Sequence, residues 1–214
     1  MKRIKRMRNT PRWRFTTVAA AVVAGASALV LSACGPTYTY LTSTKSESYL
    51  AVPHSWKVFS QSSIMSSTGS SGTGSFAYLA FFDDNSRPSL KDSLAATTKP
   101  WGVLRIRNLS GSEQASYSFD SLGNELIQLD QMTQSGQAQV VGNTTVLTHG
   151  KYRGIRQEVA IAVAGKTLLA DEEGYVNSGT TKAWALLVGC SASCFNQNHA
   201  EINRLVQSWT VGKS

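Results

Sequence analysis

The sequence predicts an α+β domain in which an antiparallel β-sheet is flanked by helices and a C-terminal helix packs on the sheet. Between residues 138 and 188, strand-like segments follow one another with connections too short for a crossover helix, so neighbouring strands must be antiparallel. Near the C-terminus, Ile202, Leu205, Val206 and Trp209 recur at i, i+3, i+4 and i+7, which gives a helix one apolar stripe. A run of strands with segregated helices is typical of the α+β class.

Residues 1–33 have the pattern of a bacterial export signal. Seven lysines and arginines precede an apolar run from Val18 to Leu31, which is shorter than the roughly 20 residues of a membrane-spanning helix. The tetrapeptide Leu31-Ser32-Ala33-Cys34 resembles the lipobox of bacterial lipoproteins of the actinobacterial type, in which the cysteine receives a diacylglyceryl group before cleavage. The resemblance implies a protein anchored through Cys34 to the extracytoplasmic face of the cell membrane. A plain secretory signal is the alternative.

The basic composition carries no information about partners once this signal is set aside. The whole chain has a formal charge of +8, but 7 of its 21 basic residues precede Cys34 and all 13 acidic residues follow it. The mature chain is therefore close to neutral, and we expect no nucleic-acid partner. It has enough residues for one ordinary domain. We expect a lipid-anchored tether over residues 34–48 and a single domain over residues 49–214.

Cys190 and Cys194 remain as an even pair in an exported chain, where neighbouring thiols usually oxidise. The pair predicts a local structural disulfide. A zinc site that also uses His199 is the alternative, but the neighbourhood lacks a fourth ligand. We expect no metal and no cofactor.

The first half of the domain mixes strands with polar connections. Residues 35–48 are rich in Thr, Ser and Tyr and suit a tether. Residues 61–75 are Ser- and Gly-rich and predict a mobile loop, in which Ile64 and Met65 are the residues placed to contact the core or a ligand. The remaining expectations are strands at 49–52, 56–59, 76–82 and 101–109, a short helix at 89–96 and a longer helix over 120–136.

The second half reads as a succession of strands closed by a helix. The expected strands span 138–141, 144–148, 152–163, 167–176 and 182–188, with hairpin turns at 164–166 and 177–179. After Cys194, the spacing of Asn198 and Glu201 resembles a capping box at the start of the final helix.

Two segments resemble the Mog/PsbP-like family. They are the opening Tyr49-Leu50-Ala51-Val52-Pro53-His54-Ser55-Trp56-Lys57-Val58-Phe59 and the late strands with a final helix that ends in Ser208-Trp209-Thr210-Val211. Ser55 stands where the family usually has Gly, and the stretch from Ser60 to Val146 is unmatched. The resemblance implies a central antiparallel sheet flanked by helices and leaves the function open, because family members bind different partners.

The sequence contains few parts from which an active site is built. It lacks a P-loop, a dinucleotide-binding glycine motif, a hydrolase elbow, HExxH and Ser-x-x-Lys. Three histidines remain as candidate bases: His54 in a turn, His149 at the end of a strand and His199 near the last helix. The acidic run 171–173 lacks the ligand spacing of a calcium loop and predicts a solvated strand edge or turn.

Aromatic residues are better candidates for binding. Trp101 lies between Lys99-Pro100 and Gly102, which predicts an exposed ring able to stack on a sugar or a partner. With Ile64 and Met65 it forms the candidate binding surface. We therefore expect a non-catalytic binding module of the cell envelope whose partner is a protein, a glycan or a lipid. The alternatives are a cell-wall hydrolase or transferase that uses His149 or His54 with a carboxylate, and a purely structural envelope protein.

Overall fold

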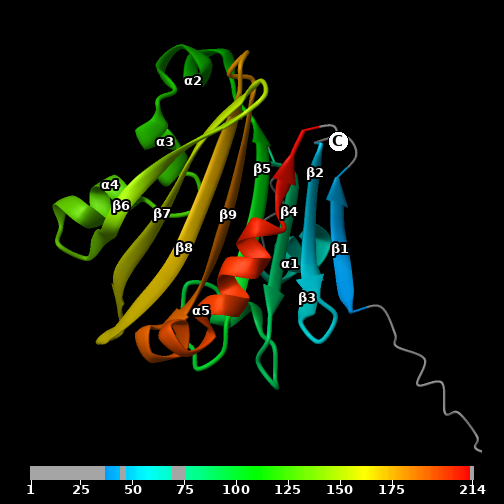
Figure 1. Cartoon of the computed structure of the whole chain (residues 1–214), viewed down its shortest axis with the longest axis vertical. Helices are drawn as coiled ribbons and strands as arrows, with labels where there is room; N and C mark the ends of the chain where they lie inside the picture. Colours follow the sequence, from blue (N-terminus) through cyan, green and yellow to red (C-terminus); the bar gives the residue numbers. More distant parts are fainter. Residues whose placement is uncertain (1–36, 44–46, 69–75, 213–214) are drawn as a thin grey trace, which may run out of the picture. The chain divides into compact units, whose positions relative to one another are not determined.

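The computed structural model describes residues 37–43, 47–68 and 76–212, so the predicted export signal and Cys34 lie outside the described residues. The elements are arranged as two antiparallel sheets with helices on both faces of the larger one (Figure 1). In chain order they are β1 (Tyr38–Ser43), β2 (Ser48–Pro53), β3 (Lys57–Ser60), α1 (Gln61–Thr68), β4 (Phe76–Asp83), the 3-10 helix η2 (Leu90–Asp92), β5 (Trp101–Asn108), α2 (Gly111–Ser116), α3 (Phe119–Gly123), α4 (Leu129–Gln134), β6 (Ala138–His149), β7 (Tyr152–Val163), β8 (Lys166–Asn177), β9 (Lys182–Ser191), α5 (Ala192–Gln207) and β10 (Thr210–Val211).

The larger sheet has seven strands in the order β3-β4-β5-β9-β8-β7-β6, and all neighbours are antiparallel. The predicted hairpin at 164–166 is present, with Val163 paired to Lys166 across two residues at positive φ, Ala164 (48°) and Gly165 (75°). Positive φ at both central positions matches the twist of a two-residue hairpin. The predicted α+β class is confirmed.

Helix α5 covers one face of this sheet and carries the predicted apolar stripe. Ile202, Leu205 and Val206 are buried against strand residues that include Trp184 and Leu186. Each fully buried aliphatic side chain contributes about 1.5–3 kcal/mol relative to exposure, so the stripe is a main reason why the helix holds its place. The helix begins earlier than the Asn198 signal indicated, because Ser191 caps it and accepts a hydrogen bond from the backbone N–H of Cys194.

The three-stranded sheet has the order β1-β2-β10. It corrects the expectation that residues 34–48 form a tether, because β1 pairs with β2 from Tyr38 to Ser43 and buries Leu41. Thr and Tyr have high β-propensity, and the composition that suggested a linker also suits an edge strand.

Two other expectations from the first half are corrected. Residues 61–68 of the expected mobile loop form α1, in which Ile64 packs against the apolar cluster on the second face of the sheet; residues 69–75 lie outside the described residues. The helix expected over 120–136 is interrupted, because α3 ends at Gly123 and α4 begins at Leu129. Glu125 lies in this interruption, is buried and binds Arg107 of β5. The segment between α3 and α4 is therefore held on the sheet by this buried ion pair and is not helical.

Candidate functional site

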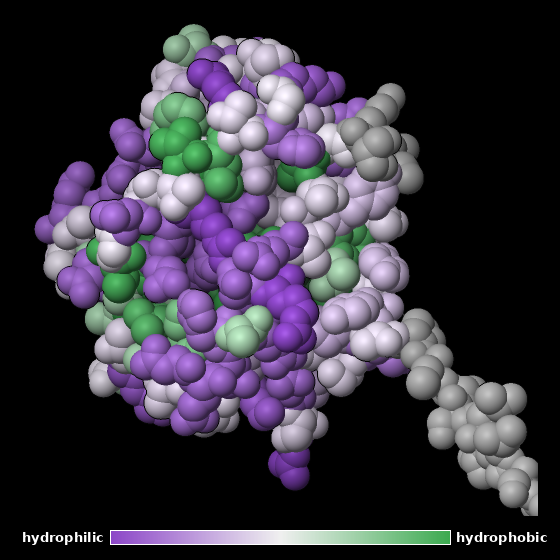
Figure 2. All heavy atoms as spheres, viewed as in Figure 1, coloured by the Kyte–Doolittle hydropathy of each residue, from purple (hydrophilic) through white to green (hydrophobic). Residues whose placement is uncertain are grey.

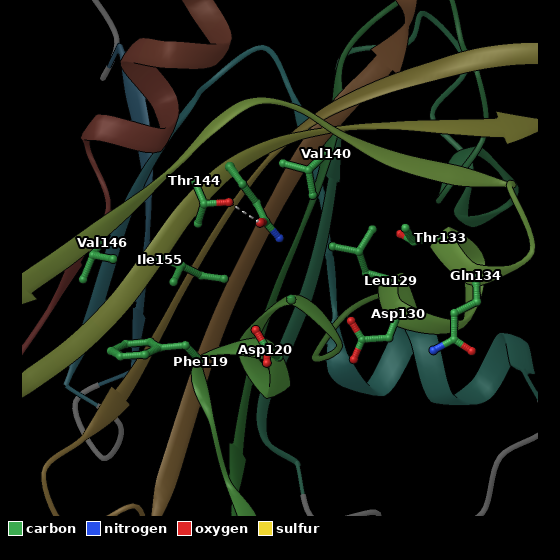
Figure 3. A pocket seen from close by; sticks show the side chains of 12 residues that line it. Phe119, Asp120, Leu129, Asp130, Thr133, Gln134, Val140, Thr144, Val146 and Ile155 are labelled. Carbon is green, nitrogen blue, oxygen red and sulfur yellow. Dashed lines mark hydrogen bonds between the residues drawn. The ribbon is translucent and has the colours of Figure 1, made fainter.

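A cavity of about 510 Å³ lies between the outer strands of the large sheet and the helices α3 and α4; we call it the bulge pocket. Figure 3 shows side chains of β6 and β7 on one side of it and side chains of the two helices on the other. Figure 2 shows a few separate apolar patches on a face that is otherwise mostly hydrophilic. The residues that line the pocket are Phe119, Asp120, Gly123, Leu129, Asp130, Thr133, Gln134, Val140, Thr144, Val146, Ile155 and Gln157.

The pocket exists because the ladder between β6 and β7 is interrupted. The regular register stops at Val141 and resumes at Thr145, and Gly142 takes a φ of 76°, where glycine avoids the steric cost of a side chain. Gln157 of β7 faces this bulge. The hydroxyl of Thr144 donates to Oε1 of Gln157 at 3.1 Å, the contact drawn in Figure 3. The bulge thus places a buried, hydrogen-bonded amide at the floor of the pocket.

Glu172 of β8 supports this amide from behind. Nε2 of Gln157 donates to Oε2 of Glu172 at 2.9 Å, and Glu172 is fully buried. Its Oε1 has no hydrogen-bond partner among the described residues. Burial raises the pKa of Glu172 to about 8, and the nearby carboxylate of Glu125 adds to the rise, whereas the Gln157 hydrogen bond opposes it. At neutral pH the floor is therefore supported by a protonated, uncharged carboxyl group.

Gly123 allows helix α3 to approach this floor. A Cβ at this position would lie 3.0 Å from Nε2 of Gln157 and 3.3 Å from Cδ2 of Leu129. Such contacts are tight, so a larger side chain would push the amide or the helix away. The glycine at the end of α3 therefore helps to set the depth of the pocket.

A second polar cluster holds the interrupted helical segment on the sheet. The carboxylate of Glu125 accepts hydrogen bonds from Nε and Nη2 of Arg107 at 2.7 and 2.9 Å and from the hydroxyl of Tyr117 at 2.6 Å. Arg107 also binds Glu113, and Arg105 donates to the backbone carbonyl of Glu125. Hydrogen bonds to Glu125 raise the pKa of Arg107, which stays charged. This cluster anchors the segment that joins α3 and α4, the two helices that contribute side chains to the bulge pocket.

A second hollow of about 520 Å³ lies on the opposite face of β6 and β7, beside α5; we call it the acidic hollow. Arg156 of β7 binds both oxygens of Asp171 and also Asn203 of α5. His199 and Glu158 lie at its rim, with 3.5 Å between Nε2 and Oε1. The hollow thus contains two carboxylates and one arginine.

The acidic run 171–173 is not the solvated edge that the sequence indicated. All three residues are buried in β8. Strand alternation directs Asp171 and Glu173 toward α5, where both interact with Arg156, and directs Glu172 toward Gln157 on the other face. Burial raises the pKa of Glu173 to about 7, although Arg156 and a hydrogen bond from Tyr175 lower it. The missed signal was that the run lies inside a predicted ten-residue strand.

Trp101 is corrected from an exposed ring to a core residue. It is completely buried in β5, packs with Phe81, and its indole N–H donates to the carbonyl of Ala95 at 2.9 Å. Ile64 packs against the same cluster. Met65 is half-buried on α1, where its sulfur accepts a hydrogen bond from Nε2 of Gln61. The three residues do not line the bulge pocket. A buried strand that begins directly after Pro100 explains the error, since the Lys-Pro-Trp-Gly sequence also suits a loop.

The remaining candidates lie apart from both hollows, except His199. Cys190 and Cys194 lie at disulfide distance, with Cα atoms 5.9 Å apart, and link the end of β9 to the first turn of α5. His54 is exposed and contacts the hydroxyl of Thr39, and His149 is exposed at the end of β6. Within the described ranges, no group of three His, Cys, Asp or Glu side chains is placed to hold a metal ion. Over the same ranges, no helix has the length and apolar character needed to cross a membrane.

No protein-family model and no curated protein matches the chain. Among solved structures, it is similar to the cyanobacterial PsbP protein (CyanoP) of Synechocystis sp. PCC 6803, with 11% identity and a TM-score of 0.55 over 83% of this chain and 95% of that one. It also resembles LpqN of Mycobacterium tuberculosis, described as involved in cell envelope biogenesis (13% identity, TM-score 0.47, 84% and 88% covered), and the Ran-binding protein Mog1p of Saccharomyces cerevisiae (9%, 0.46, 81% and 95%). The CyanoP likeness shows a shared PsbP-like fold.

Proposed function

We propose that this protein is a lipid-anchored, extracytoplasmic binding module of the cell envelope that holds the apolar part of a partner in the bulge pocket. The observation that carries the proposal is the pocket itself. Its volume of about 510 Å³ lies within the range of ligand sites, which is roughly 300–1,000 Å³. Apolar side chains from two strands and two helices surround the oriented amide of Gln157, and a few polar groups of the helices complete the lining, which is the usual composition of such sites.

The floor supplies the specificity. The Gln157 amide uses one N–H on Glu172 and one lone pair on Thr144, which leaves a second N–H and a second lone pair for a ligand. Because Glu172 is uncharged at neutral pH, the amide is oriented without a buried negative charge at the floor. A ligand group with both hydrogen-bonding functions, such as an amide, therefore suits this position.

A non-catalytic role agrees with the geometry. A general base must lie within hydrogen-bond reach of the reacting group and needs a partner that positions it. Neither His54 nor His149 lines the bulge pocket or the acidic hollow, and His199 is an exposed residue beside Glu158. The bulge pocket contains carboxylates and amides but no nucleophile paired with a base.

The anchor is tested separately from the pocket. Two acyl chains on Cys34 would hold the protein at the membrane, since each buried methylene contributes about 0.8 kcal/mol and one chain alone gives only marginal retention. We expect Cys34→Ala to be released from membranes or to accumulate unprocessed. The anchor would be contradicted if this variant stayed in the membrane fraction and migrated like the wild type, and if the wild type incorporated no labelled fatty acid.

The pocket is tested with a photo-crosslinking amino acid placed at Val146 in the full-length protein in living cells. Val146 lines the pocket and is 66% exposed, so the substitution does not disturb the core. Tyr40, on β1 and 67% exposed, provides the matched control position. We expect a defined adduct from position 146 that is absent from position 40. Identical adduct patterns at both positions, or none, would overturn the assignment of the bulge pocket as the binding site.

A further inference from the structure

Strand β6 is an unusually unprotected sheet edge. It is the last strand of the seven-stranded sheet, has 12 residues, and within the described residues its ladder partner is β7. Natural edge strands are commonly protected by charged residues, proline, short length or a β-bulge, and of these β6 has the bulge between Val141 and Thr145. Residues 138–149 contain no Asp, Glu, Lys, Arg or Pro. The opposite edge strand, β3, has four residues and begins with Lys57.

The two hollows lie on the two faces of this edge. Val140, Thr144 and Val146 of β6 line the bulge pocket, whereas Val141, Thr145 and Leu147 line the acidic hollow. The first hollow is largely apolar inside, with Asp120 and Asp130 on its helical side (Figure 3). The acidic hollow is lined by Glu158, Asp171 and Arg156. Both faces of the edge therefore offer depth, and both carry carboxylates.

We propose that β6 receives an extended peptide segment of a protein partner as an added strand, with side chains that alternate between apolar and basic residues. The proposal rests on the function proposed above and specifies the partner. Backbone groups of β6 would supply the hydrogen bonds, and the hollows would supply specificity, because successive side chains of a strand point to opposite faces of a sheet. Apolar side chains would lean toward the bulge pocket, and basic ones toward Glu158 in the acidic hollow.

Charge favours this occupant over a second copy of the chain. A symmetric pairing of two β6 strands would extend one continuous sheet, in which the acidic hollow of each copy lies on the same face as that of its neighbour. Like charges brought together across an interface weaken it, whereas a basic peptide complements them. A lipid would occupy the pocket without using the backbone groups of the edge.

The probe is a fluorescent ten-residue peptide of alternating valine and lysine, titrated into the mature protein at low salt and followed by anisotropy. We expect saturable binding, together with at least tenfold slower amide hydrogen exchange in β6 but not in β3. Two further peptides are N-methylated at all valines or at all lysines. Only one edge of an added strand faces β6, so one N-methylated peptide should lose binding and the other should retain it.

Val146→Lys tests the location, because it adds a like charge beside the bound peptide, and Tyr40→Lys is the control of matched exposure. We expect at least tenfold weaker binding for the first variant and unchanged binding for the second. Strand addition would be overturned if the two N-methylated peptides bound equally well, if the two lysine variants had equal effects, or if the peptide did not bind. Protection of β6 that rises with protein concentration in the absence of peptide would assign the edge to a second copy.

These results separate this proposal from the proposed function. A small-molecule or lipid adduct at position 146 in cells, combined with no strand protection by the peptide, would retain the bulge pocket as a binding site and reject the added strand. Absence of a specific adduct at position 146 would reject the binding site, and the added strand with it.

Discussion

Gln157 and Glu172 are cross-strand neighbours on β7 and β8 whose side chains meet at 2.9 Å directly behind the bulge pocket. On the other face of the sheet the neighbouring acids have a cationic partner instead, because Asp171 and Glu173 interact with Arg156. A buried carboxyl group that has an amide partner and no cation is most stable when protonated. The support of the pocket floor is therefore sensitive to pH.

The first prediction concerns the stability of the fold against pH. Because the pKa of Glu172 is raised from 4.5 to about 8, the folded protein retains a proton that the unfolded chain loses. The free energy of unfolding should therefore fall as the pH rises from about 4.5 to 8, at up to about 1.4 kcal/mol per pH unit. Glu173, with a pKa of about 7, contributes a loss of the same sign over a narrower range.

Glu172→Gln should remove most of this fall and make the protein more stable than the wild type at pH 8.5. Urea unfolding at pH 5 and pH 8.5 measures the difference. Glu158→Gln is the control, because its half-exposed side chain lies on the adjacent strand β7. A parallel pH dependence in Glu172→Gln and wild type would contradict the buried neutral carboxyl group.

The second prediction concerns the buried ion pair below the interrupted helix. Glu125→Gln removes the charge that Arg107 and Tyr117 share, and we expect a loss of about 3 kcal/mol in the free energy of unfolding, as for other broken buried pairs. Glu113→Gln changes the other, half-exposed partner of Arg107 while preserving its capping role, and should cost less than about 1 kcal/mol. Equal losses, measured by denaturant unfolding, would show that Glu125 is not the anchor.

The third prediction compares two glycines. A Cβ on Gly102 would lie 2.1 Å from the ring of Phe82, which is fully buried in β4. Gly102→Ala should therefore destabilise the protein by about 1–3 kcal/mol or more through overpacking. Gly111, the first residue of α2, has nothing within 4 Å of a Cβ, and Gly111→Ala should be neutral or stabilising by up to about 1 kcal/mol. Thermal unfolding of the two variants measures both effects, and a neutral Gly102→Ala would contradict the packing of β5 on β4.

The fourth prediction concerns the cysteine pair. Intact-mass measurement of the purified domain should show Cys190 and Cys194 oxidised and no bound zinc. A five-residue loop restricts the unfolded chain only modestly, so the double variant Cys190→Ala/Cys194→Ala should lose about 2 kcal/mol. The wild-type protein treated with reductant is the control and should lose a similar amount. Two free thiols in the native domain would overturn the assignment.

Local patterns were predicted well where a single segment carried the whole signal. The apolar run before Asp83 gave the buried strand β4, and the short glycine-containing turn at Ala164-Gly165 specified the β7–β8 hairpin. The stripe from Ile202 to Val206 specified the buried face of α5. In each case the side chains that cause the structure are neighbours in the chain, and their period of 2 or 3.6 is visible without the fold.

The bulge pocket was not visible in this way. Gln157 and Glu172 are 15 residues apart, and Phe119 reaches the same cavity from another element. Trp101 was assigned to a surface because its neighbours suit a loop, but it lies in the interior strand β5 and is completely buried in the apolar cluster that contains Phe81. A tether was expected where β1 lies, because the composition does not reveal that β2 pairs with it.

The sequence by itself determined the α+β class, the hairpins and the apolar face of the last helix, because each depends on residues that are close together in the chain. Only the tertiary structure decided which side chains are buried and which polar groups meet. The acidic run 171–173 shows the reason: alternation in β8 sends its members to opposite faces, and the elements packed on each face then decide that Glu173 interacts with Arg156 and Glu172 with Gln157. The packed fold therefore decides the environment of each charged group, and the polarity of the pocket follows from it.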